Sequence, residues 1–551
     1  MEDGLRLDTN LVDYAILAIY FVAVLGIGFA AKRYIKTSLD YFLSGRSLPA
    51  WITGLAFISA NLGALEILGM AANGAQFGLY TLHYYWIGAI PAMVFLGIVM
   101  MPFYYGSKVR SVPEYLRLRF NKPTHVYNAL SFALATVLIA GVNLYALALV
   151  LELLLGWPIL VGIVVAAAIV LVYITLGGLS SAIYNEVLQF FIIVAALVPL
   201  TIIGLTDVGG WSGLKDRIVE MQGNDQLLQS WDGTAAGAVD NPLGASWIPI
   251  VFGLGFVLSF GYWTTNFAEV QRALSAKSLG AARRTPLIGA YPKIFIPAIT
   301  IIPGLVALVT IKGLGSDRPN MEYNNAIPLL MNEYLPNGML GLALVGLIAA
   351  FMAGVAANVS AFNTVVTYDL WEPYVKGGQS DAYYLNFGRI ATVGGILIGI
   401  LTALIASGYS NIMDYIQLLF SFFNAPLFAT FIIGMFWKRM TPWAGFWGLV
   451  AGTVGAAAAH YGNKWGWFDL GSAQAAAFWG AMAAFALDAI VSVIVTFVTA
   501  PKPVSELQGL VYGMANTEDR EAASERAWYR RPITLAAGAL GLTAVLSIIF
   551  A

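Results

Sequence analysis

The sequence predicts an all-α membrane protein with about fourteen transmembrane helices. Three observations lead to this prediction: the composition is strongly apolar, long apolar runs recur along the whole chain, and Lys and Arg gather in alternate connections between those runs. Of the 551 residues, 59% are hydrophobic and 11% are charged, and the mean hydropathy is +0.75. This is more apolar surface than a soluble domain can bury, so the lipid bilayer is the expected partner.

The apolar runs are long enough to cross a bilayer, which requires roughly 18 residues or more in a helix. They lie near 11–31, 49–75, 79–105, 125–153, 158–176, 182–206, 246–268, 286–312, 338–368, 386–408, 414–437, 442–462, 473–499 and 532–550. The connections are short apart from 207–245, 313–337 and 500–531. None of them could form a soluble catalytic domain of ordinary size.

The positions of the basic residues predict the orientation, because Lys and Arg concentrate in cytoplasmic loops. Most follow odd-numbered helices: Lys32, Arg33, Lys36, Arg46, Lys108, Arg110, Arg117, Arg119, Lys122, Arg272, Lys277, Arg283, Arg284, Lys438, Arg439, Arg526, Arg530 and Arg531. We therefore expect a multi-pass protein of the inner or plasma membrane of the cell, with both termini outside. The first ten residues are polar and acidic, unlike the basic start of a signal peptide, so the first apolar run is expected to be retained.

Composition also argues against several classes of function. The formal net charge is −1, so bulk electrostatics favours no nucleic-acid partner. Cysteine is absent, and His83, His125 and His460 are far apart in the sequence, so we expect no thiol chemistry and no clustered metal site. Without a nucleotide or metal motif either, the sequence predicts neither an enzyme nor an organic cofactor.

The predicted helix at 49–75 contains residues that a plain lipid-facing helix would not. Its segment 58–74 carries Asn61, Gly63 and Glu66, and glycine lowers helix propensity by roughly 1 kcal/mol. One interpretation is a discontinuous helix that presents backbone and side chains to a ligand or ion. The other is a glycine-rich helix packed closely on its neighbours. These residues alone leave both interpretations open.

Other charged residues fall within predicted spans at Glu186, Lys293 and Asp488. Each charge at the centre of a spanning helix costs about 2.5–3.5 kcal/mol, so such residues are expected to face the bundle interior. Lys293 could either reach a central cavity or extend to the membrane surface. Predicted helix nine carries a stripe of small residues that includes Ala350 and Gly354. Such a stripe is typical of a close-packed seam, and it could also bring backbone carbonyls together around a small cation.

Seven short motifs occur in order from predicted helix one to helix twelve. They read DYFLSGRSLP at 40–49, SANLG at 59–63, VPEYLRLRF at 112–120, GGLSSA…NEVLQ at 177–189, YW…VQRALSAK at 262–277, YIQ at 415–417 and FWKRMTPWAGFWG at 436–448. Together they resemble the sodium:solute symporter family, in particular the bacterial sodium–galactose and animal sodium–glucose cotransporters. The resemblance implies a LeuT-like core of two inverted five-helix repeats, with the solute held midway and a sodium site between helices two and nine.

On this resemblance the chain divides into five parts. They are an N-terminal tail with a peripheral helix and cytoplasmic loop (1–48), a first inverted repeat of helices two to six (49–206), an extracellular loop (207–245), a second inverted repeat of helices seven to eleven (246–440) and three peripheral helices (441–551).

The resemblance also implies solute-contacting residues. Four match the family pattern, namely Asn61, Tyr262, Lys293 and Gln417, with Tyr262 as an aromatic inner gate. Three others depart from it, because the family's contacts fall on Glu66, Tyr85 and Ser259, and Tyr84 joins them as a neighbour. A site whose hydrogen-bond partners have changed can reject the former substrate by orders of magnitude. Galactose or glucose in particular is therefore not implied.

The implied sodium ligands depart further from the family pattern. They fall on Ser59, Leu62, Ala350, Ala353 and Gly354, of which the last two occupy positions of hydroxyl ligands. Losing two of about five oxygens should weaken sodium binding. Glu186 stands at the implied ion exit. Proton coupling through Glu66 or Glu186 is the competing hypothesis, because burial favours the protonated form of a carboxylate.

The sequence thus predicts a secondary active transporter that imports a small hydrophilic solute by alternating access. A sugar or polyol is the expected solute and Na⁺ the expected coupling ion. One alternative is a symporter for a carboxylate, nucleoside or amino-acid-like solute, driven by protons. A more remote one is a transporter-like sensor. The expected partners are the solute and the bilayer, and no oligomeric state follows from the sequence.

Overall fold

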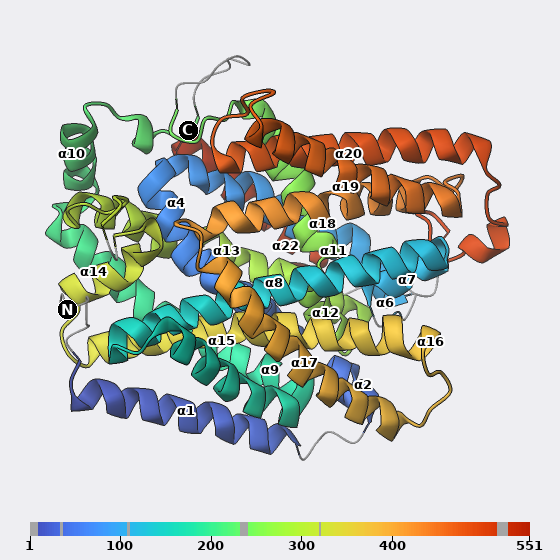
Figure 1. Cartoon of the computed structure of the whole chain (residues 1–551), viewed down its shortest axis with the longest axis horizontal. Helices are drawn as coiled ribbons and strands as arrows, with labels where there is room; N and C mark the ends of the chain where they lie inside the picture. Colours follow the sequence, from blue (N-terminus) through green and yellow to red (C-terminus); the bar gives the residue numbers. More distant parts are fainter. Residues whose placement is uncertain are drawn as a thin grey trace.

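The computed structural model describes residues 9–32, 37–106, 109, 111–231, 241–318, 321–514 and 527–550. These residues form helices and no β-strand; one isolated parallel bridge joins Leu48 and Ala276. Most of the long helices run roughly along one common direction (Figure 1). The prediction of an all-α protein is therefore confirmed for the part of the chain that is described.

Helices occupy every one of the fourteen predicted runs. In order they are α1 (Leu11–Lys32), α3 (Ala50–Asn61) followed by η2 (Leu65–Gly69) and α4 (Met70–Phe77), η4 (Tyr84–Ala89) followed by α5 (Ile90–Phe95), η5 (Leu96–Met100) and α6 (Met101–Gly106), α8 (Lys122–Leu155), α9 (Ile159–Asp207), η7 (Pro249–Ser259) followed by α11 (Phe260–Thr265) and α12 (Phe267–Leu274), α13 (Leu279–Thr310), α15 (Met339–Val365) followed by η9 (Val366–Trp371), α17 (Asp381–Ala406), α18 (Ile412–Phe436), α19 (Pro442–Lys464), α20 (Ala473–Val498) and α22 (Pro532–Ile549).

Shorter helices lie in the connections: α2 (Ser38–Leu43), α7 (Val112–Arg119), α10 (Gly210–Gln222), α14 (Ala326–Tyr334) and α16 (Glu372–Tyr374). Among the described residues, ten helices are long and apolar enough to cross a membrane, and twelve if each of two bent pairs counts as one span. The other two predicted runs form α19 and the first half of α9.

The predicted spans 158–176 and 182–206 are not separated by a loop, because α9 continues through both. They are divided instead by a sharp kink at Gly178, where φ is +52° and ψ is −151°. Glycine adopts this backbone conformation far more readily than residues with a Cβ atom. A Cβ there would also lie 2.7 Å from the carbonyl oxygen of Tyr41 in α2, so the kink lets two elements approach closely.

Two spans are interrupted, and each is the first span of a predicted repeat. The helix α3 and the segment Leu65–Leu82 meet at 60°, after Leu62 leaves the helical conformation. The segment Pro249–Thr265 and α12 meet at 48°, where Asn266 is extended and its side chain accepts a hydrogen bond from the N–H of Ala268. The first interruption decides between the two interpretations that the sequence left open, in favour of a discontinuous helix. The second was not predicted.

The two interrupted spans run in opposite directions. Leu48, which precedes α3, is hydrogen-bonded to the segment that follows α12: its N–H donates to Ser275 O at 3.2 Å and its carbonyl accepts from Lys277 N at 2.8 Å. The start of one interrupted span therefore lies beside the end of the other. This is the arrangement expected of an inverted repeat, in which broken helices occupy corresponding positions of the two halves.

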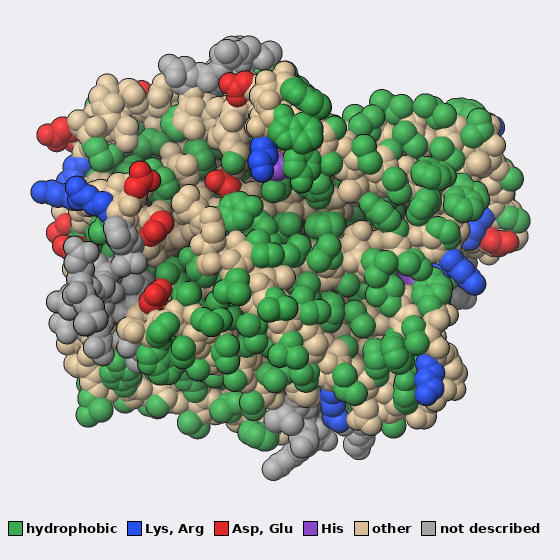
Figure 2. Space-filling view, in the orientation of Figure 1, with side chains coloured by type: hydrophobic (Ala, Val, Ile, Leu, Met, Phe, Trp, Pro, Cys, Tyr) green, Lys and Arg blue, Asp and Glu red, His purple; other side chains and the backbone are tan. Residues whose placement is uncertain are grey.

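One end of the bundle gathers the basic connections, and we call it the basic end. Arg46 donates to Val109 O and Lys502 to Leu118 O, each at 2.9 Å, so several of these connections contact one another. The first and last described helices meet the opposite end: Asp13 accepts from the N–H of Gly338, and Phe550 O accepts from Ser230 Oγ. Hydrophobic side chains cover much of the flank between the two ends (Figure 2), as a lipid-facing surface requires.

Two arginines predicted to lie in solvated loops are fully buried instead, so that prediction is wrong for Arg119 and Arg272. The guanidinium of Arg119 donates to the carbonyl oxygens of three residues at and just beyond the end of α18: Gly434, Trp437 and Met440. Carbonyls at a helix C-terminus lack partners within the helix, so a buried cation there satisfies them.

Candidate functional site

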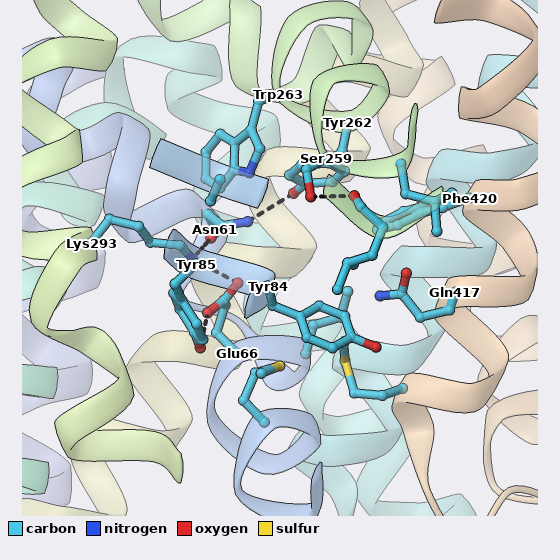
Figure 3. A pocket seen from close by; sticks show the side chains of 16 residues that line it. Asn61, Glu66, Tyr84, Tyr85, Ser259, Tyr262, Trp263, Lys293, Gln417 and Phe420 are labelled. Atoms are coloured by element: carbon cyan, nitrogen blue, oxygen red, sulfur yellow. Dashed lines mark hydrogen bonds and ion pairs between the residues drawn. The ribbon is translucent and has the colours of Figure 1, made fainter. Parts of the chain in front are cut away.

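A cavity with about 510 Å³ of atom-free space, part of it open to solvent, lies beside the interruption of α3 (Figure 3). Its lining includes all eight residues predicted to contact the solute: Asn61, Glu66, Tyr84, Tyr85, Ser259, Tyr262, Lys293 and Gln417. The rest of the lining is mostly apolar: Leu65, Met70, Ala89, Leu254, Leu258, Trp263, Met413 and Phe420. The tertiary structure thus brings these residues together from α3, η2, η4, η7, α11, α13 and α18.

An ion pair forms one wall of the cavity. Lys293 is 1% exposed, and its Nζ lies 2.7 Å from Glu66 Oε1. The same ammonium donates to Asn61 Oδ1, and the Tyr85 hydroxyl donates to Glu66 Oε2 at 2.7 Å. Lys293 therefore points into the bundle and does not extend to the membrane surface, which resolves the alternative left open by the sequence. The two opposite charges match one another within this wall.

Tyr262 connects the cavity to the interrupted helix behind it. Its hydroxyl accepts from Asn61 Nδ2 at 3.0 Å and donates to Glu269 Oε1 at 2.8 Å. Its ring lies 4.9 Å, centroid to centroid, from the ring of Phe420. Tyr262 therefore stands between the cavity and α12, in the direction of the basic end. Its role as a gate stays a prediction.

The remaining predicted contacts differ in what they offer a solute. Gln417 lines the cavity (Figure 3), and its Oε1 is buried with no hydrogen-bond partner. Ser259 already donates to Leu254 O at 2.8 Å, and the Tyr84 hydroxyl donates to Gln474 Oε1, so Tyr84 contributes its ring rather than its hydroxyl. A buried acceptor without a partner is unfavourable by about 1–3 kcal/mol, so Gln417 is the member of the lining best placed to gain from a bound hydroxyl group.

The residues predicted to hold sodium lie where α3 and α15 approach one another, and a residue from α8 lies between them. Asn143 Oδ1 accepts from the N–H of Ala64 at 2.9 Å, just after the interruption. A Cβ atom on Gly354 would lie 2.6 Å from Asn143 Cγ, and one on Gly63 would lie 3.4 Å from Gly354 Cα. Asn143 thus occupies the space beside Gly354 where the resemblance implies a hydroxyl ligand.

The other implied sodium ligands are buried at the same crossing. Ser59, Leu62, Ala350 and Ala353 are almost completely inaccessible, and Ser59 Oγ has no hydrogen-bond partner. Ala353 and Gly354 can offer only backbone oxygens. The available ligands at this crossing are therefore carbonyl oxygens, the Ser59 hydroxyl and the Asn143 amide oxygen. Their role in holding sodium stays a prediction.

Three charged residues lie between Tyr262 and the basic end. Arg272 donates through Nε and Nη2 to both oxygens of Glu186, and through Nη1 to Ala268 O. Glu186 and Arg272 are fully buried, and Glu269 is 2% exposed. Glu186, the predicted ion exit, is therefore engaged by a buried arginine in this conformation, and its transport role stays a prediction.

Glu269, Arg272 and Asn143 are parts of the site that the sequence did not predict. Helix seven was expected to end near residue 268, with Arg272 in a loop. Asn266 instead ends one helix and caps the next, so α12 continues inside the bundle after a 48° bend, with all of its residues buried. The Asn266 cap position could have signalled this, because asparagine is strongly preferred where a helix begins. Asp488 does face the interior as expected, but it accepts from Thr430 and Ser492 away from the cavity.

With the fold and cavity described, comparison with known proteins establishes the family. The family model described as "Sodium:solute symporter family" matches residues 41–452, about three quarters of the chain. The chain belongs to this family. The symporter is accordingly a multi-pass membrane transporter and not an enzyme, and its family couples solute transport to sodium.

Curated relatives of the symporter carry sugar and polyol names. It is 28% identical over 470 residues to a sodium/glucose cotransporter of Vibrio parahaemolyticus, covering 82% of this chain and 84% of the relative. It is 30% identical over 470 residues to sodium/myo-inositol cotransporter 2 of Mus musculus, covering 80% and 69%. It is 30% identical over 475 residues to sodium/glucose cotransporter 1 of Oryctolagus cuniculus, covering 80% and 71%.

Solved structures support the fold. The symporter superimposes on a substrate-bound, outward-open Na⁺-coupled sialic acid symporter with a TM-score of 0.75 at 20% identity, covering 90% of this chain and 99% of that one. It superimposes on the nucleobase-cation-symport-1 family transporter Mhp1, in a closed conformation with a bound hydantoin, with a TM-score of 0.53 at 14% identity, covering 85% and 97%. The LeuT-like fold is thereby established.

Proposed function

We propose that this symporter imports a small uncharged polyhydroxylated solute, a sugar or polyol, together with Na⁺ by alternating access. The observation that carries the proposal is the cavity beside the interruption of α3. Its charges are matched by the Glu66–Lys293 pair, and its other polar groups are amides and hydroxyls. Such groups pair with the hydroxyls of a polyol without leaving a net charge buried.

The ion pair favours a neutral solute over a carboxylate. An anion needs a cation free to accept it, whereas the ammonium of Lys293 already contacts Glu66 Oε1 and Asn61 Oδ1. Taking Lys293 away from Glu66 would leave a partly buried carboxylate without its partner, which is strongly unfavourable. The rings of Tyr84, Tyr85 and Trp263 can cover the apolar face of a sugar or cyclic polyol. The names of the curated relatives support the same class of solute.

For the coupling ion, we propose the crossing of α3 and α15 as the sodium site. Hard cations prefer several oxygen ligands. The unpaired Ser59 hydroxyl and the Asn143 amide oxygen compensate in part for the hydroxyls that Ala353 and Gly354 lack. Family membership supports Na⁺ as the ion. Binding there would hold α3 against α15 and so favour one of the two access states.

The orientation in the membrane follows from the basic end, which we propose to be cytoplasmic by the positive-inside rule. Both termini then lie outside, in the inner or plasma membrane of the cell. The repeats keep the proposed bounds 49–206 and 246–440, each beginning near an interrupted span. Solute would enter from the opposite end and leave toward the basic end once Tyr262 moves aside.

Uptake into proteoliposomes tests this proposal. Labelled glucose, galactose, myo-inositol and a carboxylate control would be supplied with and without an inward Na⁺ gradient at equal pH on both sides. We expect uptake of at least one sugar or polyol to depend on Na⁺, and Gln417→Ala to raise its half-saturating concentration. The exposed variant Gln379→Ala, in the connection before α17, serves as the control. Uptake of only the carboxylate, or uptake indifferent to Na⁺, would refute the proposal.

A further inference from the structure

The charges in and behind the cavity do not balance. Within the described network, three carboxylates (Glu66, Glu186 and Glu269) meet two cations, Lys293 and Arg272. Lys293 pairs with Glu66 and Arg272 pairs with Glu186. Glu269 is the carboxylate left without a cation of its own, and a fully ionised network would carry a net charge of −1. A buried net charge in a low-dielectric interior is costly unless it is neutralised.

The contacts of Glu269 show which of its atoms is unsatisfied. Oε1 accepts from the Tyr262 hydroxyl at 2.8 Å, whereas Oε2 is buried with no hydrogen-bond partner. The side chain is only 2% exposed, so bulk water does not reach it. A lone acceptor atom of this kind suits a proton bound directly to it. In the described part of the chain, no group of three or more His, Asp or Glu could hold a multivalent metal ion, which would need several such oxygens.

The ionisable groups around Glu269 come from a small number of elements. Neither α3 nor α15, which pack against α12, contains an ionisable side chain. Next to these, α2 carries Asp40, which caps its own helix at Thr37, and Tyr41, whose hydroxyl lies 3.4 Å from Thr392 Oγ1. The helix α6 carries Tyr104, which donates to Thr264 O, and Tyr105, which donates to Ala276 O. The groups that act electrostatically on Glu269 are Arg272 on its own helix, Tyr262 on α11, Glu186 on α9 and Lys293 on α13.

We propose that Glu269 is a proton-binding site of the transport cycle. With Tyr262 closing the cavity, Oε2 of Glu269 carries the proton and the network is neutral. When Tyr262 and α12 move to open the cavity toward the basic end, water reaches Glu269. The carboxylic acid then transfers its proton to that water, leaving a hydrated carboxylate and a hydronium ion. One proton therefore moves with the solute, in addition to any sodium.

The link to the gate is a continuous hydrogen-bonded path. Asn61, which contacts Lys293 at the cavity wall, donates to the Tyr262 hydroxyl, and that hydroxyl donates to Glu269. A bound solute that displaces Asn61 therefore changes the environment of Glu269 without touching it. The inference rests on the proposed transport cycle, and it differs from proton coupling through Glu66 or Glu186, because each of those carboxylates already has a cation.

The test compares wild type with Glu269→Gln, a neutral isostere of the protonated acid. Proteoliposomes with equal Na⁺ on both sides would receive a transported solute with and without an inward proton gradient. For one coupled proton, a gradient of one pH unit is expected to raise the steady-state accumulation of wild type by up to about tenfold. Glu269→Gln should lose this response, and counterflow measured on the same proteoliposomes checks whether the variant still exchanges the solute. Glu220→Gln, exposed on α10, is the matched control and should respond like wild type.

Infrared spectroscopy of the purified protein gives a readout independent of transport. The carbonyl band of a protonated carboxylic acid should be present in wild type at neutral pH and lose one component in Glu269→Gln. An unchanged band, or a Glu269→Gln variant that still responds to the proton gradient, would overturn the inference. A Glu269→Gln variant that loses its dependence on Na⁺ but still responds to the proton gradient would also overturn the inference, because Glu269 would then bind a cation rather than a proton. If no solute is transported by wild type, the proposed function fails while the infrared result still decides the inference.

Discussion

In the two interrupted spans, the backbone groups freed at the break are satisfied in different ways. At the break after Asn61, the freed N–H of Ala64 is satisfied by an amide from a distant helix, Asn143, and the nearby charges form a matched pair. At the break after Thr265, Asn266 uses its own side chain to start the next helix. That helix carries Glu269 and Arg272 into a buried region where the carboxylates outnumber the cations.

The difference separates two tasks within one transporter. The first break has a balanced electrostatic environment, which suits recognition of a neutral solute. The second break has a carboxyl group without a matching cation beside Tyr262, which suits a step that must respond to the binding or release of an ion. An inverted repeat can therefore keep its geometry while its two halves take on different chemistry, since the geometry depends on the backbone and the chemistry on a small number of side chains.

Removing the cation at each break is expected to have the largest effect. Arg272→Met leaves Glu186 and Glu269 buried together, whereas Lys293→Met leaves only Glu66, whose side chain is 15% exposed. Losing one partner of a buried ion pair typically destabilises by roughly 3–5 kcal/mol, so Arg272→Met should lie at or above this range and Lys293→Met below it. Thermal unfolding in detergent measures both. Adding Glu186→Gln to Arg272→Met should restore much of the stability; equal losses in the two single variants would contradict the contrast.

Acid is expected to weaken the protein near the end of the first interrupted span, where His83 follows the segment Leu65–Leu82. His83 Nε2 donates to Ser230 O at 2.5 Å, and burial lowers the pKa of this histidine from 6.5 to about 4. The neutral form is favoured in the folded state, so its stabilisation is complete above pH 6.5 and is lost as the pH falls toward 4.

This acid effect should lower the free energy of unfolding by an amount on the order of 3 kcal/mol. Unfolding measured between pH 7.5 and pH 4.5 should show a decline that His83→Gln, which keeps a donor, largely removes. The same variant supplies a background for the pH experiments on Glu269. A decline of the same size in His83→Gln would assign the acid sensitivity to another group.

Replacing the two asparagines that stabilise the breaks should lower the free energy of unfolding by smaller amounts, which differ less from one another. Asn143→Ala leaves the N–H of Ala64 buried and unpaired, for an expected loss of about 1–3 kcal/mol. Asn266→Ala removes a helix cap, for an expected loss of about 1 kcal/mol. Chemical denaturation in mixed micelles compares the two variants.

The space beside Gly354 offers a sharper form of this test. Gly354→Ser alone should be poorly tolerated because its Cβ would clash with Asn143. On the Asn143→Ala background, the same serine has room and restores a hydroxyl ligand. The double variant should then bind Na⁺ more tightly than Asn143→Ala. If Gly354→Ser is tolerated equally well on both backgrounds, Asn143 does not compete for this space.

The smallest loss of stability is expected at Ser59. Its hydroxyl is buried without a partner, so Ser59→Ala removes an unfavourable buried polar group and should stabilise the protein by about 1 kcal/mol when no Na⁺ is bound. If Ser59 supplies an oxygen to sodium, the half-saturating Na⁺ concentration for uptake should nevertheless rise several-fold. Sodium-dependent uptake over a range of concentrations measures this. An unchanged Na⁺ dependence would remove Ser59 from the sodium site.

The sequence by itself determined the number and approximate position of the spans, because the lipid bilayer imposes a length and an apolar composition on each one. It also indicated the interruption near Gly63, where polar and flexible residues stand in an otherwise apolar run. The cavity residues were predicted through the family motifs rather than through periodicity. The residues named by those motifs line one cavity although they are up to 356 positions apart in the sequence, from Asn61 to Gln417.

Only the tertiary structure decided which charges and amides meet. The second break depends on a 48° bend at Asn266 that packs α12 against α3 and α15, and an asparagine near the end of an apolar run does not specify that direction. The pairing of Arg272 with Glu186 and the insertion of Asn143 beside Gly354 join residues far apart in the sequence. Hydrophobic patterning is set locally by each segment's contact with lipid. Electrostatic balance is a property of the whole interior, so it became visible only when the helices were placed together.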